Sequence, residues 1–358
     1  MTTLNIIFVV SLISNFVLLY ILSKKKYIFF NKNRNKQIRW GNSKKSHYGG
    51  LSFFITFIII FVTIIVFDPT YSLSKQFIYF FFVICIISVY GLLDERFIFK
   101  PKYKLLFQIL ISYILIKSGV ELKLFFNEDL NFVFNLFWYL FLFNALNMVD
   151  NIDLGYFASI FPSFLFFSVS VYFYNFDTNL EFLTIVYFAG LLIFFLFNRF
   201  PSKIFLGEIG SAQITAIAII LSYFFIWKEK EFINHQTSLF DFLKNNLFFI
   251  FIFNDFLITF VRRIYLKKSI YLGDTNHISH NFTKIISVNF FALYVICLGI
   301  LSMLMNYIFE NYLSIANWQN ISYIFAYYIF ILIVNFLLYL YCLKKMPQRQ
   351  KFKHQTII

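Results

Sequence analysis

The stretch NFVFNLFWYLFLFNALNMVDNIDLGYF, residues 131–157, decides the fold of this chain. Its first thirteen residues, 131–143, carry no charged side chain and are mostly large and apolar. Asparagines and aspartates then follow closely, at positions 144, 147, 150, 151 and 153. An apolar helix whose end collects polar side chains is typical of a membrane span that meets water at that end. The stretch therefore predicts a membrane-spanning helix that delivers polar groups to one side.

The composition of the whole chain agrees with this interpretation. Of 358 residues, 60% are hydrophobic and 13% are charged, whereas soluble domains carry about 25% charged residues. Three cysteines lie singly within apolar runs and favour packing roles. The sequence predicts an all-α, polytopic integral membrane protein, located in a cell (inner or plasma) membrane, with no nucleic-acid partner.

Charge-poor apolar runs recur along the chain and predict about eleven membrane-spanning helices. We place them at 4–22, 50–67, 77–93, 104–120, 131–149, 156–174, 182–198, 209–227, 246–261, 289–308 and 321–343.

Lysine and arginine set the orientation of these spans. With the N-terminus outside, the inner loops and adjoining helix ends hold 25 of the 31 basic residues. Because basic residues accumulate on the cytoplasmic side, we expect the N-terminus outside and the C-terminus in the cytoplasm. We expect one transmembrane catalytic domain over residues 1–343, with its active-site loops on the cytoplasmic face, and a basic cytoplasmic tail over 344–358.

Seven of the 17 acidic residues fall on this basic inner side, most of them at or just beyond a helix end. Acids near membrane depth are unfavourable unless they serve a site, so this layer favours one shared polar site over ordinary solvation of helix ends. The seven are Asp94, Glu95, Asp150, Asp153, Glu208, Asp255 and Asp274.

The opening stretch supplies the first group of candidate site residues. Asn144, Asn147 and Asp150 share one face of a helix end by their spacing, and Asp153 lies one turn beyond. Amide and carboxylate oxygens suit Mg²⁺. A polar helix end with asparagine caps is the alternative interpretation.

Two further stretches would bring phosphate-binding chemistry to the same side. In GLLDERFIFKPKYKLLFQ, residues 91–108, Asp94 and Glu95 end one span and Lys104 opens the next, where it can hold a phosphate. In GEIGS, residues 207–211, glycines flank Glu208 before a new helix, whose N-terminus favours an anion. Each stretch is a weak signal by itself.

The last inner loop carries GDTNHISHNF, residues 273–282. His277 and His280 are three residues apart and lack the further ligands of a structural zinc site. They are better explained as hydrogen-bond donors to phosphate.

Together, in this order, the motifs from Lys36 to His280 resemble the membrane family that transfers a sugar-1-phosphate from a UDP-N-acetylhexosamine to a polyprenyl phosphate. Its undecaprenyl-phosphate N-acetylglucosaminyl-1-phosphate transferase branch is the nearest. The resemblance implies release of UMP as the first membrane step of a cell-envelope polysaccharide, with N-acetylglucosamine favoured. Homodimers are common among relatives, so a homodimer is one expectation.

The resemblance also implies roles for individual residues. The implied ligands of Mg²⁺, with Mn²⁺ as an alternative, are Asn147 and Glu208. The implied catalytic residues are Asp94, Glu95, Asp150 and Asp153. The implied substrate-binding residues are Lys104, Asn144, His277 and His280.

The chain departs from the family pattern at five positions. Glu95 and Glu208 replace the usual aspartate, Asn151 and Leu154 replace glycine, and Ser279 replaces a histidine. These departures keep an inactive homologue acting as a membrane scaffold open as an alternative. A polytopic transporter is a second alternative, although transporter sites lie near the bilayer midplane, often between internal repeats.

Overall fold

The computed structural model describes residues 2–24, 45–67, 72–150, 152–173, 177–224, 239–267, 277–312 and 318–345. Within these ranges the elements are helices, joined by turns and by one isolated β-bridge between Ser46 and Ile204. The predicted all-α polytopic fold is confirmed. Asn151, Asp274 and the tail beyond residue 345 lie outside the described residues.

Eight of the described helices are long and apolar enough to cross a membrane. Each one coincides with a predicted span. They are α1 (Thr2–Lys24), α2 (Gly49–Phe67), α3 (Lys75–Phe97), α5 (Glu128–Val149), α6 (Gly155–Phe173), α7 (Thr178–Asn198), α13 (Val288–Tyr312) and α14 (Trp318–Lys345).

The three remaining predicted spans, 104–120, 209–227 and 246–261, fall on shorter helices. These are α4 (Pro101–Lys117), α8 (Gly207–Ser222) and α11 (Ile250–Tyr265), of 17, 16 and 16 residues. A 16-residue helix rises about 24 Å, less than the ~30 Å hydrocarbon core. The total of about eleven spans therefore stays a prediction.

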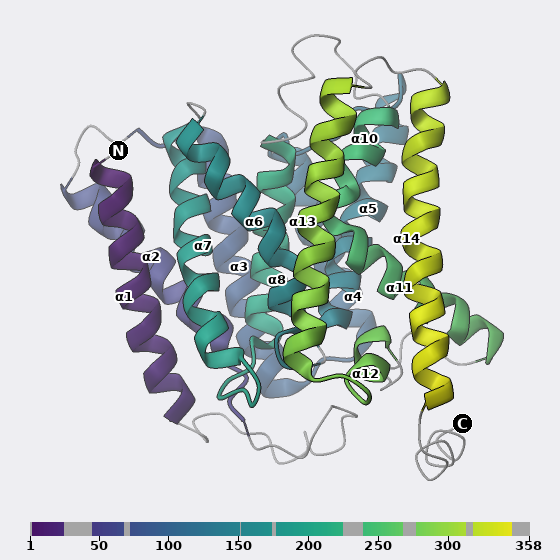
Figure 1. The fold of residues 1–358 in the computed structure, drawn as a ribbon. Coiled ribbons are helices and arrows are strands. Elements are labelled where there is room, and N and C mark those ends of the chain that lie inside the picture. The colour runs from purple at the N-terminus through teal and green to yellow at the C-terminus, as the bar shows by residue number, and fades with distance from the viewer. Residues whose placement is uncertain are drawn as a thin grey trace.

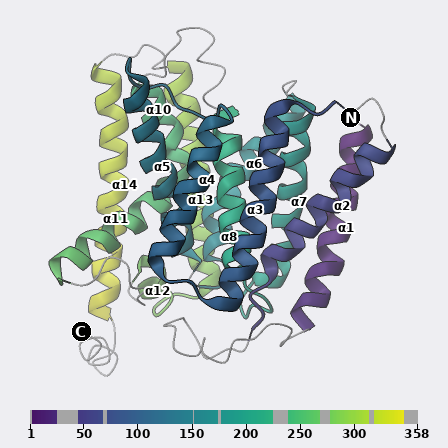
Figure 2. The same cartoon turned by 180° about the vertical axis from the view of Figure 1, so that it is seen from behind.

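Short elements complete the described chain. The helix α10 (Leu239–Asn245) and the 3₁₀ turn η3 (Asn246–Phe249) lead directly into α11. Figures 1 and 2 show α11 running obliquely to the other long helices. The five-residue helix α12 (Ile278–Phe282) lies at the lower end of the bundle in Figure 1.

The first helix begins at one end of the bundle, and the last helix ends at the opposite end. In both side views α1 begins at the upper end and α14 finishes at the lower end (Figures 1 and 2). This arrangement agrees with an odd number of crossings. At the lower end α3 finishes, α4 begins, α5 finishes and α8 begins, so the predicted motifs share one end.

The helix α8 occupies the centre of the bundle and contacts α2, α3, α5, α6 and α7. Glycines permit the closest of these approaches. A Cβ on Gly50 would lie 2.0 Å from the Gly210 nitrogen, and a Cβ on Gly91 would lie 2.5 Å from the Ile209 Cα. Small residues at helix interfaces allow such backbone approach in membrane proteins, so the N-terminus of α8 is held firmly between α2 and α3.

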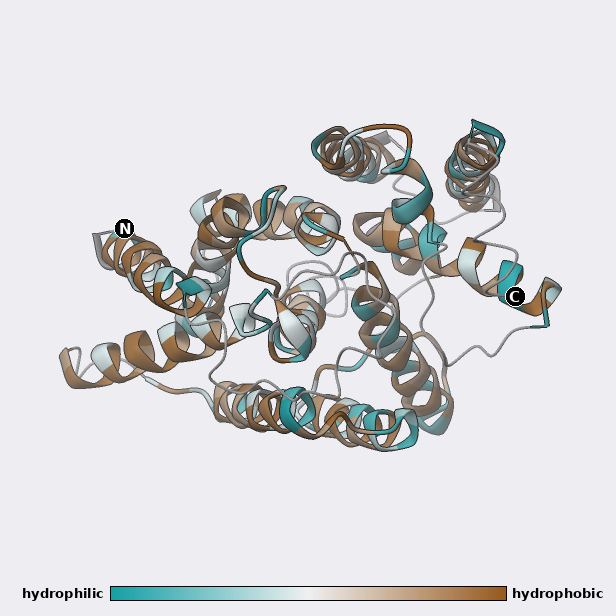
Figure 3. Ribbon diagram, turned by 90° about the horizontal axis from the view of Figure 1, so that it is seen from below, coloured by the Kyte–Doolittle hydropathy of each residue, from teal (hydrophilic) through white to brown (hydrophobic). Residues whose placement is uncertain are grey.

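Large apolar side chains cover the outside of the bundle. Ile6 on α1, Tyr307 on α13 and Phe330 on α14 are 63%, 66% and 60% exposed. Seen from the lower end in Figure 3, the helices are coloured mostly as hydrophobic and hydrophilic residues gather at several turns. Such a surface is stable against lipid tails and agrees with a membrane protein.

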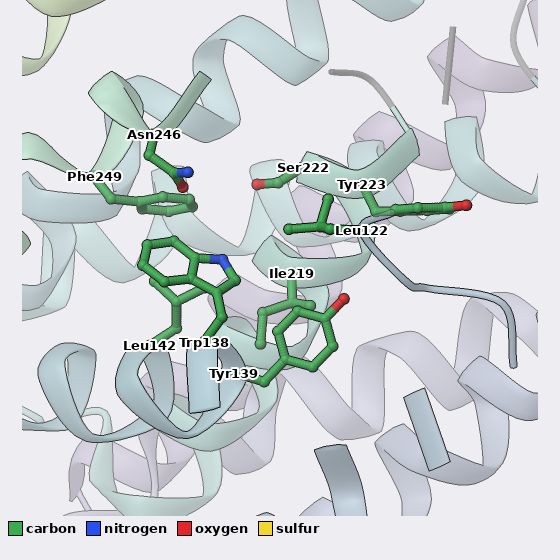
Figure 4. A pocket seen from close by; sticks show the side chains of 9 residues that line it. All are labelled: Leu122, Trp138, Tyr139, Leu142, Ile219, Ser222, Tyr223, Asn246 and Phe249. Carbon is green, nitrogen blue, oxygen red and sulfur yellow. The ribbon is translucent and has the colours of Figure 1, made fainter. Parts of the chain in front are cut away.

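A small cavity lies toward the opposite end, between the middle of α5 and the C-terminal end of α8. Its volume is about 10 Å³, close to that of one water molecule. Figure 4 shows Trp138, Ser222 and Asn246 in its wall. None of the candidate catalytic residues lines it.

Candidate active site

Lys104 joins two of the predicted motifs through ion pairs. Its Nζ lies 2.7 Å from Asp94 Oδ2 and 3.0 Å from Glu208 Oε1. The turn between α3 and α4 makes this possible, because Asp94 Oδ1 also accepts a hydrogen bond of 2.8 Å from the Phe99 backbone N–H. Pro101 then starts α4 and places Lys104 in its first turn. Helices α3, α4 and α8 thus meet at one cluster of charges.

Glu95 binds the N-terminus of α8. Its Oε1 accepts a hydrogen bond of 2.8 Å from the Glu208 backbone N–H, and its side chain is buried. A carboxylate is favourable there because the N-terminus of a helix carries a partial positive charge. Gly207 has a φ of +76°, and a Cβ on it would lie 1.9 Å from the His47 carbonyl oxygen. Glycine at 207 is therefore required for this contact.

Asn147 reaches the same helix end through Ser211. Ser211 Oγ lies 3.4 Å from both Asn147 Oδ1 and the Glu208 carbonyl oxygen. These distances are long for hydrogen bonds to a hydroxyl. Asn147 nevertheless lies beside the first turn of α8, the turn that carries Glu208.

The donor set around Glu208 fits Mg²⁺ but does not form a complete cage. Among the residues that the structure describes, no three His, Cys, Asp or Glu side chains are grouped as metal ligands. Mg²⁺ is commonly held by one or two carboxylates together with waters and substrate phosphates. The Glu208 carboxylate and the Asn147 amide oxygen are hard ligands of this kind. The metal site stays a prediction.

Asp153 is bound to the loop that follows α7. Its Oδ1 accepts a hydrogen bond of 2.7 Å from Ser202 Oγ, and its Oδ2 accepts one of 2.9 Å from the Ser202 backbone N–H. Lys45 Nζ lies 2.9 Å from Ser202 Oγ and 3.4 Å from Asp153 Oδ2. Asp153 therefore holds together the turn after α5, the loop after α7 and the residues before α2.

Asn198 strengthens the same junction. Its Oδ1 accepts a hydrogen bond of 2.8 Å from the Leu154 backbone N–H, and its Nδ2 donates one of 2.9 Å to the Ile204 carbonyl. Leu154 has a φ of +63°. The position at which the family pattern has glycine is thus held in a left-handed conformation, which glycine adopts most easily.

Asn144 and Asp150 lie at the same end of α5. Asn144 is exposed and its Nδ2 donates 3.0 Å to Gln108 Oε1 on α4 and 2.7 Å to the Leu140 carbonyl. Asp150 ends α5 at its C-terminal cap and is half-buried. Their roles in substrate binding and catalysis stay predictions.

The two histidines form a second group with Asp255. His277 Nδ1 lies 3.1 Å from Asp255 Oδ2 and 3.2 Å from Thr259 Oγ1. The His277 and His280 rings are 5.6 Å apart between centroids, and both residues are buried. This group sits where α11 meets α12 at the lower end of the bundle (Figure 1).

Sequence reasoning missed several partners that the structure reveals. Neither Ser202 nor Lys45 was among the predicted site residues. Asp255 was recognised as an inner acid, but its pairing with His277 across 22 residues was not predictable. Ser211 stood in the GEIGS motif, so its position beside Glu208 could have been anticipated.

Comparisons with known proteins find similarity over the central part of the chain. Residues 77–226 match the family described as glycosyl transferase family 4. The matched region is therefore similar to glycosyl transferase family 4. The match includes Asp94, Lys104, Asn147 and Glu208 and ends before the histidines, so the expected family resemblance is confirmed over the central part of the chain.

Two streptococcal relatives carry the name phospho-N-acetylmuramoyl-pentapeptide-transferase. The protein from Streptococcus pneumoniae serotype 2 is 28% identical over 191 residues, which cover 49% of this chain and 57% of the relative. The protein from Streptococcus suis strain 05ZYH33 is 34% identical over 160 residues, which cover 39% and 48%. The chain thus matches about half the length of these relatives.

Proposed function

We propose that this protein transfers N-acetylhexosamine-1-phosphate, with N-acetylglucosamine as the favoured sugar, from a UDP-sugar to a polyprenyl phosphate. UMP is the second product. The reaction is the first membrane step of a cell-envelope polysaccharide and depends on Mg²⁺, with Mn²⁺ as an alternative. Undecaprenyl phosphate is the proposed acceptor, and the active site faces the cytosol from the inner or plasma membrane.

One observation carries the proposal. Lys104 on α4 bridges Asp94 on α3 and Glu208 on α8, and all three residues lie within the matched region 77–226. The fold thus brings charged residues from separate parts of the sequence into direct contact. A cluster of two acids and one lysine, with an amide beside it, supplies what a reaction between phosphates needs: cations and hard oxygen ligands.

The reaction joins three negatively charged groups, so neutralising charge is the main task of the site. The acceptor phosphate attacks the phosphorus that bears the sugar, the bond to the UMP oxygen breaks, and UMP leaves. Bound Mg²⁺ would clamp the diphosphate and stabilise the leaving group. Asn147 and Glu208 would hold it, while Lys104, His277 and His280 would hold phosphates.

The acids other than Glu208 have supporting roles in this scheme. A phosphate monoester has a second pKa of about 6, so the acceptor is already mostly ionised near pH 7. Asp94 is therefore not needed as a strong base, and its 2.7 Å contact with Lys104 fits a role in orienting that ammonium. Asp150 and Asp153 would position the nucleotide.

The location of the acids favours this enzyme over a transporter. Asp94 and Glu95 lie in the last turn of α3, and Glu208 lies in the first turn of α8. Transporters place such groups near the midplane of the bilayer. A polyprenyl acceptor, in contrast, presents its phosphate at the membrane surface, because each buried CH₂ of its tail contributes about 0.8 kcal/mol to membrane binding.

The test is UMP release by the purified protein in detergent, with UDP-N-acetylglucosamine, undecaprenyl phosphate and Mg²⁺. Glu208→Gln removes the charge at the proposed metal and keeps the shape of the side chain. Glu181→Gln, an acid in the first turn of α7 at the other end of the bundle, is the matched control.

We expect release that requires lipid and metal, survives in Glu181→Gln and collapses in Glu208→Gln. Other UDP-hexosamines are tested next if this sugar gives none. No release with any of them, while nucleotide still binds, would refute the transferase and favour a scaffold.

A further inference from the structure

The junction of α11 and α12 holds a buried acid that has been given no role. Asp255 is 1% exposed, His277 is 1% exposed, and the two side chains meet at 3.1 Å. The other carboxylate oxygen, Asp255 Oδ1, accepts a hydrogen bond of 2.9 Å from the Ile278 backbone N–H. Asp255 thus binds two consecutive residues, through the ring of His277 and the backbone N–H of Ile278.

These hydrogen bonds fix the chemical form of the His277 ring. Nδ1 lies near both Asp255 Oδ2 and Thr259 Oγ1, and a carboxylate is the stronger acceptor. The Nδ1 proton is therefore directed to Asp255. In the neutral ring Nε2 then carries the lone pair, and in the charged ring it carries a second proton. A ring that carries both protons donates from Nδ1 to Asp255 and can donate from Nε2 to a phosphate oxygen.

Neighbouring side chains indicate that this junction is prepared for a polar ligand. Among the described residues, no hydrogen-bond partner is present for Asn254 Nδ2, Ser279 Oγ or Asn281 Nδ2, although all three residues are at most 2% exposed. Buried polar groups without partners are unfavourable and call for an explanation. All three atoms can donate a hydrogen bond, and phosphate oxygens accept such bonds.

We propose that Asp255 is a positioning residue that orients His277 and holds its ring protonated on Nδ1, so that Nε2 serves the phosphates of the donor sugar nucleotide. This inference rests on the proposed function. It assigns the effect of Asp255 to one partner, His277, and to one property of that partner, the placement of its ring protons.

Asp255→Asn separates positioning from simple packing. The asparagine carbonyl can still accept the Ile278 N–H, so the backbone contact is kept. Its NH₂ group would face Nδ1, and the neutral ring must then move its proton to Nε2. Loss of one hydrogen bond to a charged group corresponds to about a 10- to 100-fold decrease. We expect kcat for UMP release to fall by that factor.

A double-mutant cycle tests whether the loss passes through His277. His277→Gln and the combination Asp255→Asn/His277→Gln are measured beside Asp255→Asn, and Thr259→Val is the matched control at the same nitrogen. If Asp255 acts through His277, adding Asp255→Asn to His277→Gln lowers kcat less than about twofold. A structural role would instead lower kcat equally in both backgrounds.

Nitrogen-15 NMR of the histidine-labelled wild type gives a second readout that needs no variant to fold. His277→Gln identifies the signal. A ring protonated on Nδ1, alone or together with Nε2, is expected. A neutral ring protonated on Nε2 would overturn the proposal. Wild-type protein that releases no UMP refutes the proposed function, whereas active protein with additive losses in the cycle refutes only the positioning role.

Discussion

Replacing Lys104 with methionine is expected to tighten binding of a divalent cation, although the same change should abolish transfer. The ammonium group lies 3.0 Å from Glu208 and 2.7 Å from Asp94, so it neutralises carboxylates that a metal would otherwise use. Methionine keeps an unbranched side chain of similar length and removes the positive charge. A dication then meets a more negative site and has no ammonium to displace.

The size of the effect follows from the 3.0 Å separation. Two unit charges at that distance attract by about 5 kcal/mol at an effective dielectric constant of about 20. Lys104 and Glu208 side chains are 26% and 19% exposed, so solvent screens part of this attraction. Fully exposed pairs contribute about 0.2–1 kcal/mol, and this pair is only partly exposed. We therefore expect the free energy of Mn²⁺ binding to become about 1–2 kcal/mol more favourable, which lowers Kd roughly five- to thirty-fold.

The assay is Mn²⁺ titration of the detergent-purified protein, followed by electron paramagnetic resonance without either substrate. Lys102→Met is the matched control, because Lys102 lies in the same turn of α4 and is exposed. Mn²⁺ affinity that is unchanged or weaker in Lys104→Met than in Lys102→Met would refute the reasoning. Glu208→Gln should abolish this Mn²⁺ binding in the wild type and in both lysine variants.

Three further predictions concern stability, donor binding and pH. Gly207→Ala should lower the melting temperature far more than Gly119→Ala. Both glycines have a positive φ, but only at position 207 would the new Cβ meet a backbone oxygen at 1.9 Å. Equal shifts of the melting temperature in the two variants would contradict this prediction. Ser202→Ala removes the 2.7 Å hydrogen bond to Asp153. We expect KM for the UDP-sugar to rise about five- to tenfold in steady-state UMP release, with a smaller change in kcat. A decrease confined to kcat would contradict a role of Asp153 in positioning the nucleotide. Burial lowers the pKa of Lys284 to about 8 from 10.5, so the unfolded chain binds more protons between these values and stability should rise from pH 8 to 10.5. In Lys284→Gln the melting temperature should rise less between pH 8 and 10.5 than in the wild type. The same dependence of melting temperature on pH in both proteins would show that Lys284 does not cause the rise.

The helices were the most predictable part of the fold. Long apolar runs such as Gly155–Phe173 determine a membrane span almost by themselves, because the bilayer requires all backbone groups to be paired. The shorter helices were harder to predict. The segment 246–261 begins as a 3₁₀ turn and continues as an oblique helix to Tyr265, and such a tilt depends on packing against neighbours, which composition does not encode.

The candidate site was predictable in its members and less so in its contacts. The sequence placed Asp94, Lys104 and Glu208 on one side of the membrane, and the structure brings them into direct contact. The roles within the site depend on partners from remote loops. Asp153 binds Ser202 across 49 residues, and a pairing of that kind follows from how loops fold back and not from local spacing.

The backbone pairing ahead of α8 bears on how the chain can be divided. The amides of Gly49 and Gly50 donate to the carbonyls of Phe205 and Leu206 at 3.0 and 2.8 Å. These donors lie upstream of the family-4 region, which begins at residue 77. An expressed fragment of residues 77–226 would leave those carbonyls without their donors and open the flank of α8 that α2 covers. Candidate site residues and their structural support are therefore interleaved along the chain, and a truncated protein should keep α2 together with the matched region.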